Sequence, residues 1–171
     1  MPSQDIRIER HTMVVTVDNE PGVLARVIGL FAGRGYNIES LTVAEVDRTS
    51  HTSRITVVTS GTPAVIEQIR AQLGRLVPVH RVVDITIEKP GIEREMALIK
   101  VAGTGEKRVE AMRVSQVFRA KALDTTHSSF VFEITGAPDK IDAFIELMRP
   151  LGLVEVSRTG VAAISRGMDP M

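Results

Sequence analysis

The sequence predicts an α+β fold made of two ferredoxin-like βαββαβ domains in tandem. Strand and helix patterns follow the order strand, helix, strand, strand, helix, strand, and this order occurs twice. The two sets are separated by Lys89-Pro90-Gly91, a combination that interrupts both kinds of pattern. The 171 residues suffice for two small domains, and with 43% hydrophobic but only 4% aromatic residues their cores must be aliphatic. We therefore expect one domain over residues 1–88 and a second over 89–171.

The first half contains four predicted strands and two predicted helices. The strands are rich in β-branched residues and cover 13–17, 38–46, 54–59 and 79–87. The first helix follows the turn at 19–22, and Gly35 suits a left-handed cap at its end. Its apolar residues at helical spacing are Val23, Leu24, Val27, Ile28, Leu30 and Phe31. The second helix opens with Thr62 as a capping residue and Pro63 at the first helical position. Its apolar residues are Val65, Ile66, Ile69, Leu73 and Leu76.

The second half repeats the order of the first with a different sequence. Its predicted strands cover 95–101, 120–126, 129–135 and 153–157. A helix over 106–119 is expected to turn four residues inward: Val109, Met112, Val117 and Phe118. A second helix starts at Ala137-Pro138-Asp139, with an inward stripe of Ile141, Phe144, Ile145 and Met148. The final SRGMDPM is expected to be loose.

Composition excludes several classes of function. Lys plus Arg and Asp plus Glu number 21 each, and this balance argues against nucleic acid as a partner. A net charge near zero is also compatible with a protein that is part of a complex, because little electrostatic self-repulsion opposes association. The absence of cysteine excludes disulfide scaffolds, zinc–cysteine sites and thiol catalysis. The start, MPSQDIRIERHT, has no apolar signal core, and no apolar run approaches the roughly 20 residues that span a bilayer. We therefore expect a soluble cytoplasmic protein with no membrane partner.

No set of residues predicts catalysis or a metal site. The four histidines are scattered, without the spacing of a metal-binding pair on a helix. The segment at 103–107, GTGEK, contains only part of a phosphate-binding loop. Ser115 and the Ser128-Ser129 pair lack the context of a catalytic nucleophile. A protein that binds or regulates is therefore expected, with no catalytic residues and no metal ligands.

The turn before the first helix is the candidate binding site. Exposed backbone N–H groups at a helix start attract an anion such as a carboxylate, and Gly22 leaves the backbone open to a ligand. The amides of Asn19 and Asn37 both donate and accept hydrogen bonds, and a zwitterionic amino acid needs both. The alternative is an ordinary turn in which Asn19 caps the helix and Gly22 serves only the bend. The residues alone leave both interpretations open.

The segment DNEPGVLARVIGLFAGRGYNIESLTVA, residues 18–44, closely resembles the start of acetolactate synthase (acetohydroxyacid synthase) small regulatory subunits. The combination of PGVLARVIGLF with RGYNIESLTV is specific to that family. The resemblance continues through four further segments: SRITVVTSG (53–61), IEQIRAQLGRLVPVHRV (66–82), EREMALIKV (93–101) and VEVSRTGVAAISRG (154–167). It therefore extends over nearly the whole chain.

The resemblance implies a fold, a partner and an effector. Residues 1–88 would form an ACT regulatory domain and residues 89–171 the C-terminal ferredoxin-like domain of the family. ACT domains would pair through edge strands into a homodimer, with valine, or leucine or isoleucine, at the interface. The partner would be the catalytic large subunit, a transferase that condenses two pyruvates, or pyruvate with 2-oxobutyrate. Thiamine diphosphate, Mg and FAD are expected only in that subunit.

The same resemblance assigns the effector-binding residues. They are Asn19, Gly22, Val23, Leu24, Asn37 and Ile38. The first four match the effector turn, and the last two match residues that face it across the dimer interface. Pro21 departs from the small residue that many relatives have there, and it removes one N–H donor.

Two alternatives belong to other functional classes. A stand-alone amino-acid sensor that controls another enzyme or gene expression would need a helix pair for DNA or a basic patch, and the sequence indicates neither. An acylphosphatase-type enzyme on the same fold would need an arginine in its phosphate-binding turn. The turn here has Asn19 but no arginine.

Overall fold

The computed structural model describes residues 6–89 and 91–171. Contacts divide the chain into two compact units: residues up to Ile92 together with Val161–Met171, and Glu93–Gly160. The interpretations of residues 1–5 and of Pro90 as a boundary concern residues outside those described. Whereas the sequence-based division keeps 89–171 together, the contacts group 161–171 with the first unit. Within the described residues, no helix is long and apolar enough to cross a bilayer.

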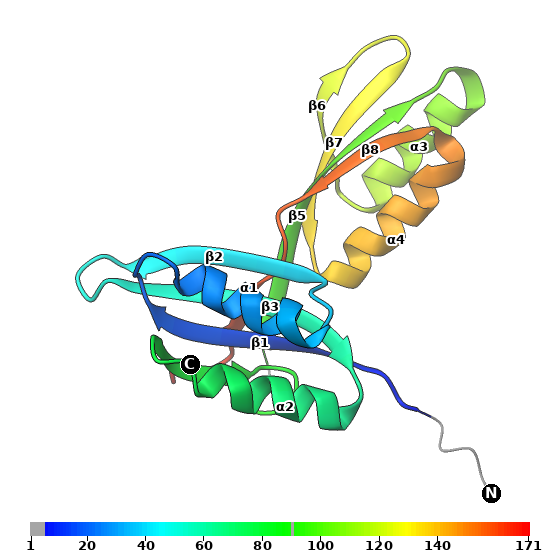
Figure 1. Ribbon diagram of the computed structural model, residues 1–171. Helices are drawn as coiled ribbons and strands as arrows, with labels where there is room; N and C mark the ends of the chain where they lie inside the picture. The colour runs from blue at the N-terminus through cyan, green and yellow to red at the C-terminus, as the bar shows by residue number, and fades with distance from the viewer. Residues whose placement is uncertain (1–5, 90) are drawn as a thin grey trace, which may run out of the picture. The chain divides into compact units, whose positions relative to one another are not determined.

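The first unit has the predicted βαββαβ order (Figure 1). Its elements are β1 (Glu9–Asp18), α1 (Val23–Arg34), β2 (Ser40–Asp47), β3 (Thr52–Gly61), α2 (Pro63–Gly74) and β4 (Val79–Asp84). The strands form an antiparallel sheet in the order β2-β3-β1-β4, so β2 and β4 are its edges. The predicted end of the last strand at residue 87 is wrong. β4 stops at Asp84, because its carboxylate accepts the N–H of Thr86 at 3.0 Å and closes a turn.

The local signals at the two helices are confirmed. Gly35 ends α1 with φ 67°, and the Thr62 side chain accepts the N–H of Val65 at 3.3 Å before Pro63 opens α2. The core lies between one sheet face and both helices, and includes Met13, Val15, Val17, Val27, Phe31, Ile69 and Leu73. Burial of each large apolar side chain stabilises the fold by about 1.5–3 kcal/mol. Two members of the predicted α1 stripe, Leu24 and Ile28, are instead 38% exposed.

The other face of this sheet is covered by the end of the chain. A strand that the sequence pattern misses, β9 (Ala162–Ser165), belongs to this segment. Val14, Ile85 and Ala163 form a small buried cluster against which Met171 packs. The Arg54 guanidinium donates to the Ala163 carbonyl at 2.7 Å. The prediction of a loose tail is therefore wrong for its first and last residues, because Ser165 ends β9 and Met171 packs against the cluster of Val14, Ile85 and Ala163.

The second unit repeats the arrangement (Figure 1). Its elements are β5 (Gly91–Ala102), α3 (Gly105–Val117), β6 (Lys121–Thr125), β7 (Ser129–Gly136), α4 (Pro138–Met148), the 3-10 helix η1 (Arg149–Leu151) and β8 (Leu153–Arg158). The sheet order is β6-β7-β5-β8. The tandem βαββαβ fold is thus confirmed, as is the buried stripe of α4.

The predicted inner face of α3 is largely wrong. Val109, Met112 and Val117 are 58%, 42% and 78% exposed. Ala111 and Ser115 are buried instead, and Phe118 packs partly against the core. The sequence of α3 is mostly polar, so its few apolar residues define no stripe, and small side chains let the helix lie close to the sheet.

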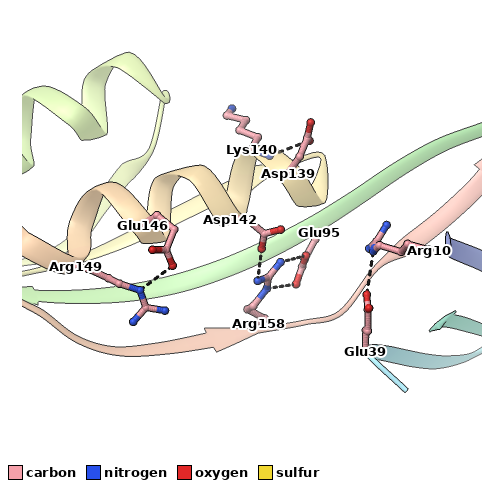
Figure 2. A network of polar contacts seen from close by, with 9 residues as sticks. All are labelled: Arg10, Glu39, Glu95, Asp139, Lys140, Asp142, Glu146, Arg149 and Arg158. Atoms are coloured by element: carbon pink, nitrogen blue, oxygen red, sulfur yellow. Dashed lines mark hydrogen bonds and ion pairs between the residues drawn. The ribbon is translucent and has the colours of Figure 1, made fainter. Parts of the chain in front are cut away.

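An ion-pair cluster joins the ends of two strands to α4 in this unit. The Arg158 guanidinium contacts both carboxylate oxygens of Glu95 at 2.6 and 2.8 Å, and one of Asp142 at 2.7 Å (Figure 2). Glu95 is buried, so this pair neutralises a carboxylate that water does not reach. The hydrogen bonds that Arg158 donates to Glu95 raise the pKa of Arg158, and the guanidinium stays charged. The cluster therefore has a structural role: through Arg158 it connects β5, β8 and α4, and we call it the Arg158 clamp.

Candidate functional site

The turn between β1 and α1 is open and has no side-chain cap. Gly22 is the N-cap residue, with φ 85° and ψ −5°, and no side chain accepts the first N–H groups of α1. The alternative in which Asn19 caps the helix is therefore wrong. The N–H groups of Leu24 and Ala25 lie in the first turn, where helical geometry provides no backbone acceptor. A Cβ on Gly22 would meet nothing within 4 Å, so the backbone faces open space. These features suit a small anion.

Two neighbouring loops hold this turn in place. The N–H of Asn19 donates to the carbonyl of His51 at 2.7 Å, and His51 has a left-handed φ of 51° at the tip of the β2–β3 hairpin. On the other side, the N–H of Asp18 donates to the Pro78 carbonyl at 3.0 Å, and the Asp18 carboxylate lies 2.5 Å from Nε2 of His80. Sequence spacing gave no signal for this pair, because its partners are 62 positions apart.

Asn37 and Ile38 lie at the other end of α1 from Asn19 and Gly22. β1 and β2 are each antiparallel to β3, so they run in the same direction, and α1 returns between them. The 12 residues of α1 correspond to about 18 Å. The carbonyl of Asn37 accepts the Thr59 hydroxyl at 2.6 Å, and its side chain is exposed. One chain therefore does not bring the two predicted groups of site residues together.

The edge strand β2 begins just after Asn37 and Ile38 and leads into the hairpin whose residue His51 contacts Asn19. Among the described strands it pairs with β3 alone, and Val43 and Val46 are 44% and 56% exposed. An unpaired apolar edge is a template for pairing with another chain. The register of β2 against β3 shifts between Glu45 and Asp47.

A buried histidine is the other titratable group of interest in this unit. Nδ1 of His11 lies 2.7 Å from Asp84, and Nε2 lies 3.1 Å from Glu9. Burial opposes protonation of His11, but the hydrogen bonds to Glu9 and Asp84 outweigh it and raise its pKa. In the part of the chain that the structure describes, no group of three or more His, Asp or Glu side chains is arranged to hold a metal ion.

Comparisons with known proteins agree over both units. A family model described as an AHAS small subunit-like ACT domain matches residues 13–81, and one described as small subunit of acetolactate synthase matches 94–167. The chain is 47% identical to a probable acetolactate synthase small subunit of Archaeoglobus fulgidus over 158 residues, covering 92% of this chain and 98% of the relative. It is 43% identical to the isozyme 3 small subunit of Escherichia coli over 159 residues, covering 92% and 96%.

A solved structure extends the similarity to three dimensions. The crystal structure of an acetolactate synthase small subunit from Thermotoga maritima matches with a TM-score of 0.78 and 39% identity. The match covers 94% of this chain and 99% of that one. Its coverage includes both βαββαβ units.

Proposed function

Because this chain belongs to the family of acetolactate synthase small subunits, we propose that it binds a branched-chain amino acid between the ACT domains of two copies of itself. Valine is the expected effector, with leucine and isoleucine as related ligands. The proposal assigns to the chain the activation and feedback regulation of the catalytic large subunit in valine, leucine and isoleucine biosynthesis. The observation that supports it best is the uncapped, glycine-led start of α1.

The start of α1 suits the carboxylate of an amino acid. The N–H groups of Leu24 and Ala25 and the positive end of the helix dipole would receive it. The ammonium group needs acceptors, and the side-chain oxygens of Asn19 and Asn37 are candidates. Pro21 offers no N–H, so the donors begin at Gly22.

A second copy of the chain would complete this site. If a two-fold axis pairs β2 with its copy in antiparallel fashion, the start of each β2 lies beside the end of the other. The end of β2 lies close to the turn at 19–22 of the same chain. The hairpin that follows β2 contains His51, whose carbonyl accepts the N–H of Asn19. Asn37 and Ile38 of one copy would then face Gly22 of the other. Such isologous pairing continues the sheet across the axis and covers Val43 and Val46.

The energies are sufficient for regulation. Burying the isopropyl group of valine contributes about 1.5–3 kcal/mol, and one methylene separates valine from leucine by only ~1–3 kcal/mol. Overlapping effector specificity is therefore expected. A coupling of about 1–3 kcal/mol between effector and enzyme state is typical of allosteric systems. Occupancy at a dimer interface supplies that coupling by changing how two domains dock.

The chemistry of the reaction belongs, in this proposal, to the large subunit. Thiamine diphosphate, Mg and FAD would be bound there, and this chain would be a non-catalytic subunit of the transferase. The test is co-purification of this chain with its large subunit, followed by acetolactate assays with and without valine. Association, stimulation and a valine response are expected. A chain that neither associates nor stimulates, yet binds valine alone, would be a stand-alone sensor and would refute the proposal.

A further inference from the structure

The second edge of the first sheet carries a cationic groove. β4 and α2 line an open cleft of about 500 Å³. The charged side chains along it are Glu67, Arg70, Arg75 and Arg81, and His80 lies among them. The lining thus holds three arginines and one carboxylate, Glu67, while the carboxylates of Glu88 and Asp18 contact Arg70 and His80 from outside the lining. We call this surface the β4–α2 groove.

Among the described residues, two of these three arginines form no ion pair with a carboxylate. Arg70 forms an ion pair with Glu88 at 2.6 Å, and His80 lies 2.5 Å from Asp18. For Arg75 and Arg81, no ion pair occurs within residues 6–89 and 91–171. Both side chains are exposed, so a partner in the groove can reach them, although water and salt screen their charge. The occupant that fits is an anion.

The shape of the groove favours a protein segment over a small molecule. Small-molecule sites enclose most of their ligand, whereas this cleft is open to solvent along an edge strand. In the part of the chain that the structure describes, β4 pairs with β1 alone, and an edge strand presents backbone N–H and C=O groups to a further strand. An extended peptide can add to such an edge, with its alternate side chains reaching flanking residues. Arg81 on the strand and Arg75 at the end of α2 would flank acidic side chains of that peptide.

We propose that the β4–α2 groove binds an acidic segment of the catalytic large subunit. The inference rests on the proposed function, in which β2 is used by the second copy of the chain and β4 stays available. The groove is also connected to the effector turn. His80 in the groove contacts the carboxylate of Asp18. The backbone N–H of Asp18 donates to the carbonyl of Pro78, which directly precedes β4. A segment bound along β4 would therefore touch the residues that hold the turn beside Asn19.

The test is charge reversal in the full-length chain, assayed with its large subunit. The double variant Arg75→Glu/Arg81→Glu is titrated into the large subunit, and the concentration for half-maximal stimulation of acetolactate formation is measured. We expect it to rise about tenfold, or ~1.4 kcal/mol. For wild type, the half-maximal concentration should increase when KCl is raised from about 50 to about 300 mM, because salt screens exposed charges. The half-maximal concentration of the variant should change less. Valine binding by the isolated variant, measured by calorimetry, should match wild type.

Matched variants make the result specific. Arg94→Glu/Lys121→Glu makes the same charge change on exposed residues of the second unit and should leave the half-maximal concentration unchanged. Arg75→Lys/Arg81→Lys keeps the charge and should retain near-normal stimulation. A free oligoglutamate peptide should compete with the large subunit, and inorganic phosphate at equal ionic strength should not.

Three outcomes would overturn the inference. One is a charge-reversal variant that stimulates at the wild-type concentration with the wild-type salt response. Another is competition by phosphate as strong as that by the peptide, which would make the groove a small-anion site. If wild-type chain itself fails to stimulate the large subunit, the proposed function fails and the groove assignment falls with it. Normal wild-type stimulation with an unaffected double variant refutes the groove alone.

Discussion

The substitution Gly22→Asp should abolish the valine response without abolishing stimulation of the large subunit. Gly22 has φ 85°, so any other residue there adopts a left-handed backbone at a cost of about 1–2 kcal/mol. Its side chain would have room, because a Cβ meets nothing within 4 Å. The new carboxylate would lie at the helix N–H groups and repel the ligand carboxylate. Two unit charges ~4 Å apart near a protein surface interact by about 4 kcal/mol, or roughly a thousandfold in affinity.

Gly22→Asn is the control for this experiment. Asparagine has the same size as aspartate and tolerates the left-handed region, but it has no charge. The difference in valine affinity between the two variants, measured by calorimetry, therefore isolates the electrostatic part. Thermal unfolding of each variant shows whether the backbone cost at residue 22 alone accounts for the loss of valine affinity. Normal valine inhibition of the reconstituted Gly22→Asp enzyme would refute the assignment, as would equal losses in the two variants.

Three further predictions concern stability. Arg158→Ala leaves the buried carboxylate of Glu95 without its partner and should lower the free energy of unfolding by about 3 kcal/mol in urea denaturation; a change below ~0.5 kcal/mol would contradict the clamp. His11 has a raised pKa in the folded state, so its contribution to stability is fully present below the unfolded value near 6.5 and is lost as the pH rises through the folded pKa. The stability difference between wild type and His11→Gln, followed by thermal unfolding against pH, should therefore shrink with rising pH, and a growing difference would reverse the sign. Removal of residues 161–171 exposes Val14, now 2% exposed, and should lower the melting temperature of the first unit by several degrees; an unchanged temperature would mean that the segment only rests on the sheet.

Local signals predicted the order of the elements well. Thr62 and Pro63 start α2, and Gly35 ends α1, because capping depends on a few adjacent residues. The inner face of α3 could not be predicted, because a polar helix that buries Ala111 and Ser115 has no apolar stripe. The strand β9 was missed because four residues without periodicity give no pattern.

The candidate site was predictable only in its local half. The turn chemistry around Gly22 is visible in a few consecutive letters. The contacts that hold the turn, from His51, Pro78 and His80, come from residues distant in sequence, and no spacing rule connects them. The position of Asn37 follows from strand direction, which requires the sheet order.

The packing of residues 161–171 on the first sheet affects how the chain folds while the ribosome synthesises it. The ACT unit is discontinuous in the chain, since its back face is covered by a segment made after the whole second unit. On the ribosome the first unit emerges with Val14 and its neighbours uncovered, and a chaperone or a neighbouring nascent chain can reach this face until residues 161–171 have been synthesised. A fusion partner or affinity tag attached directly after Met171 is likewise attached to the ACT unit.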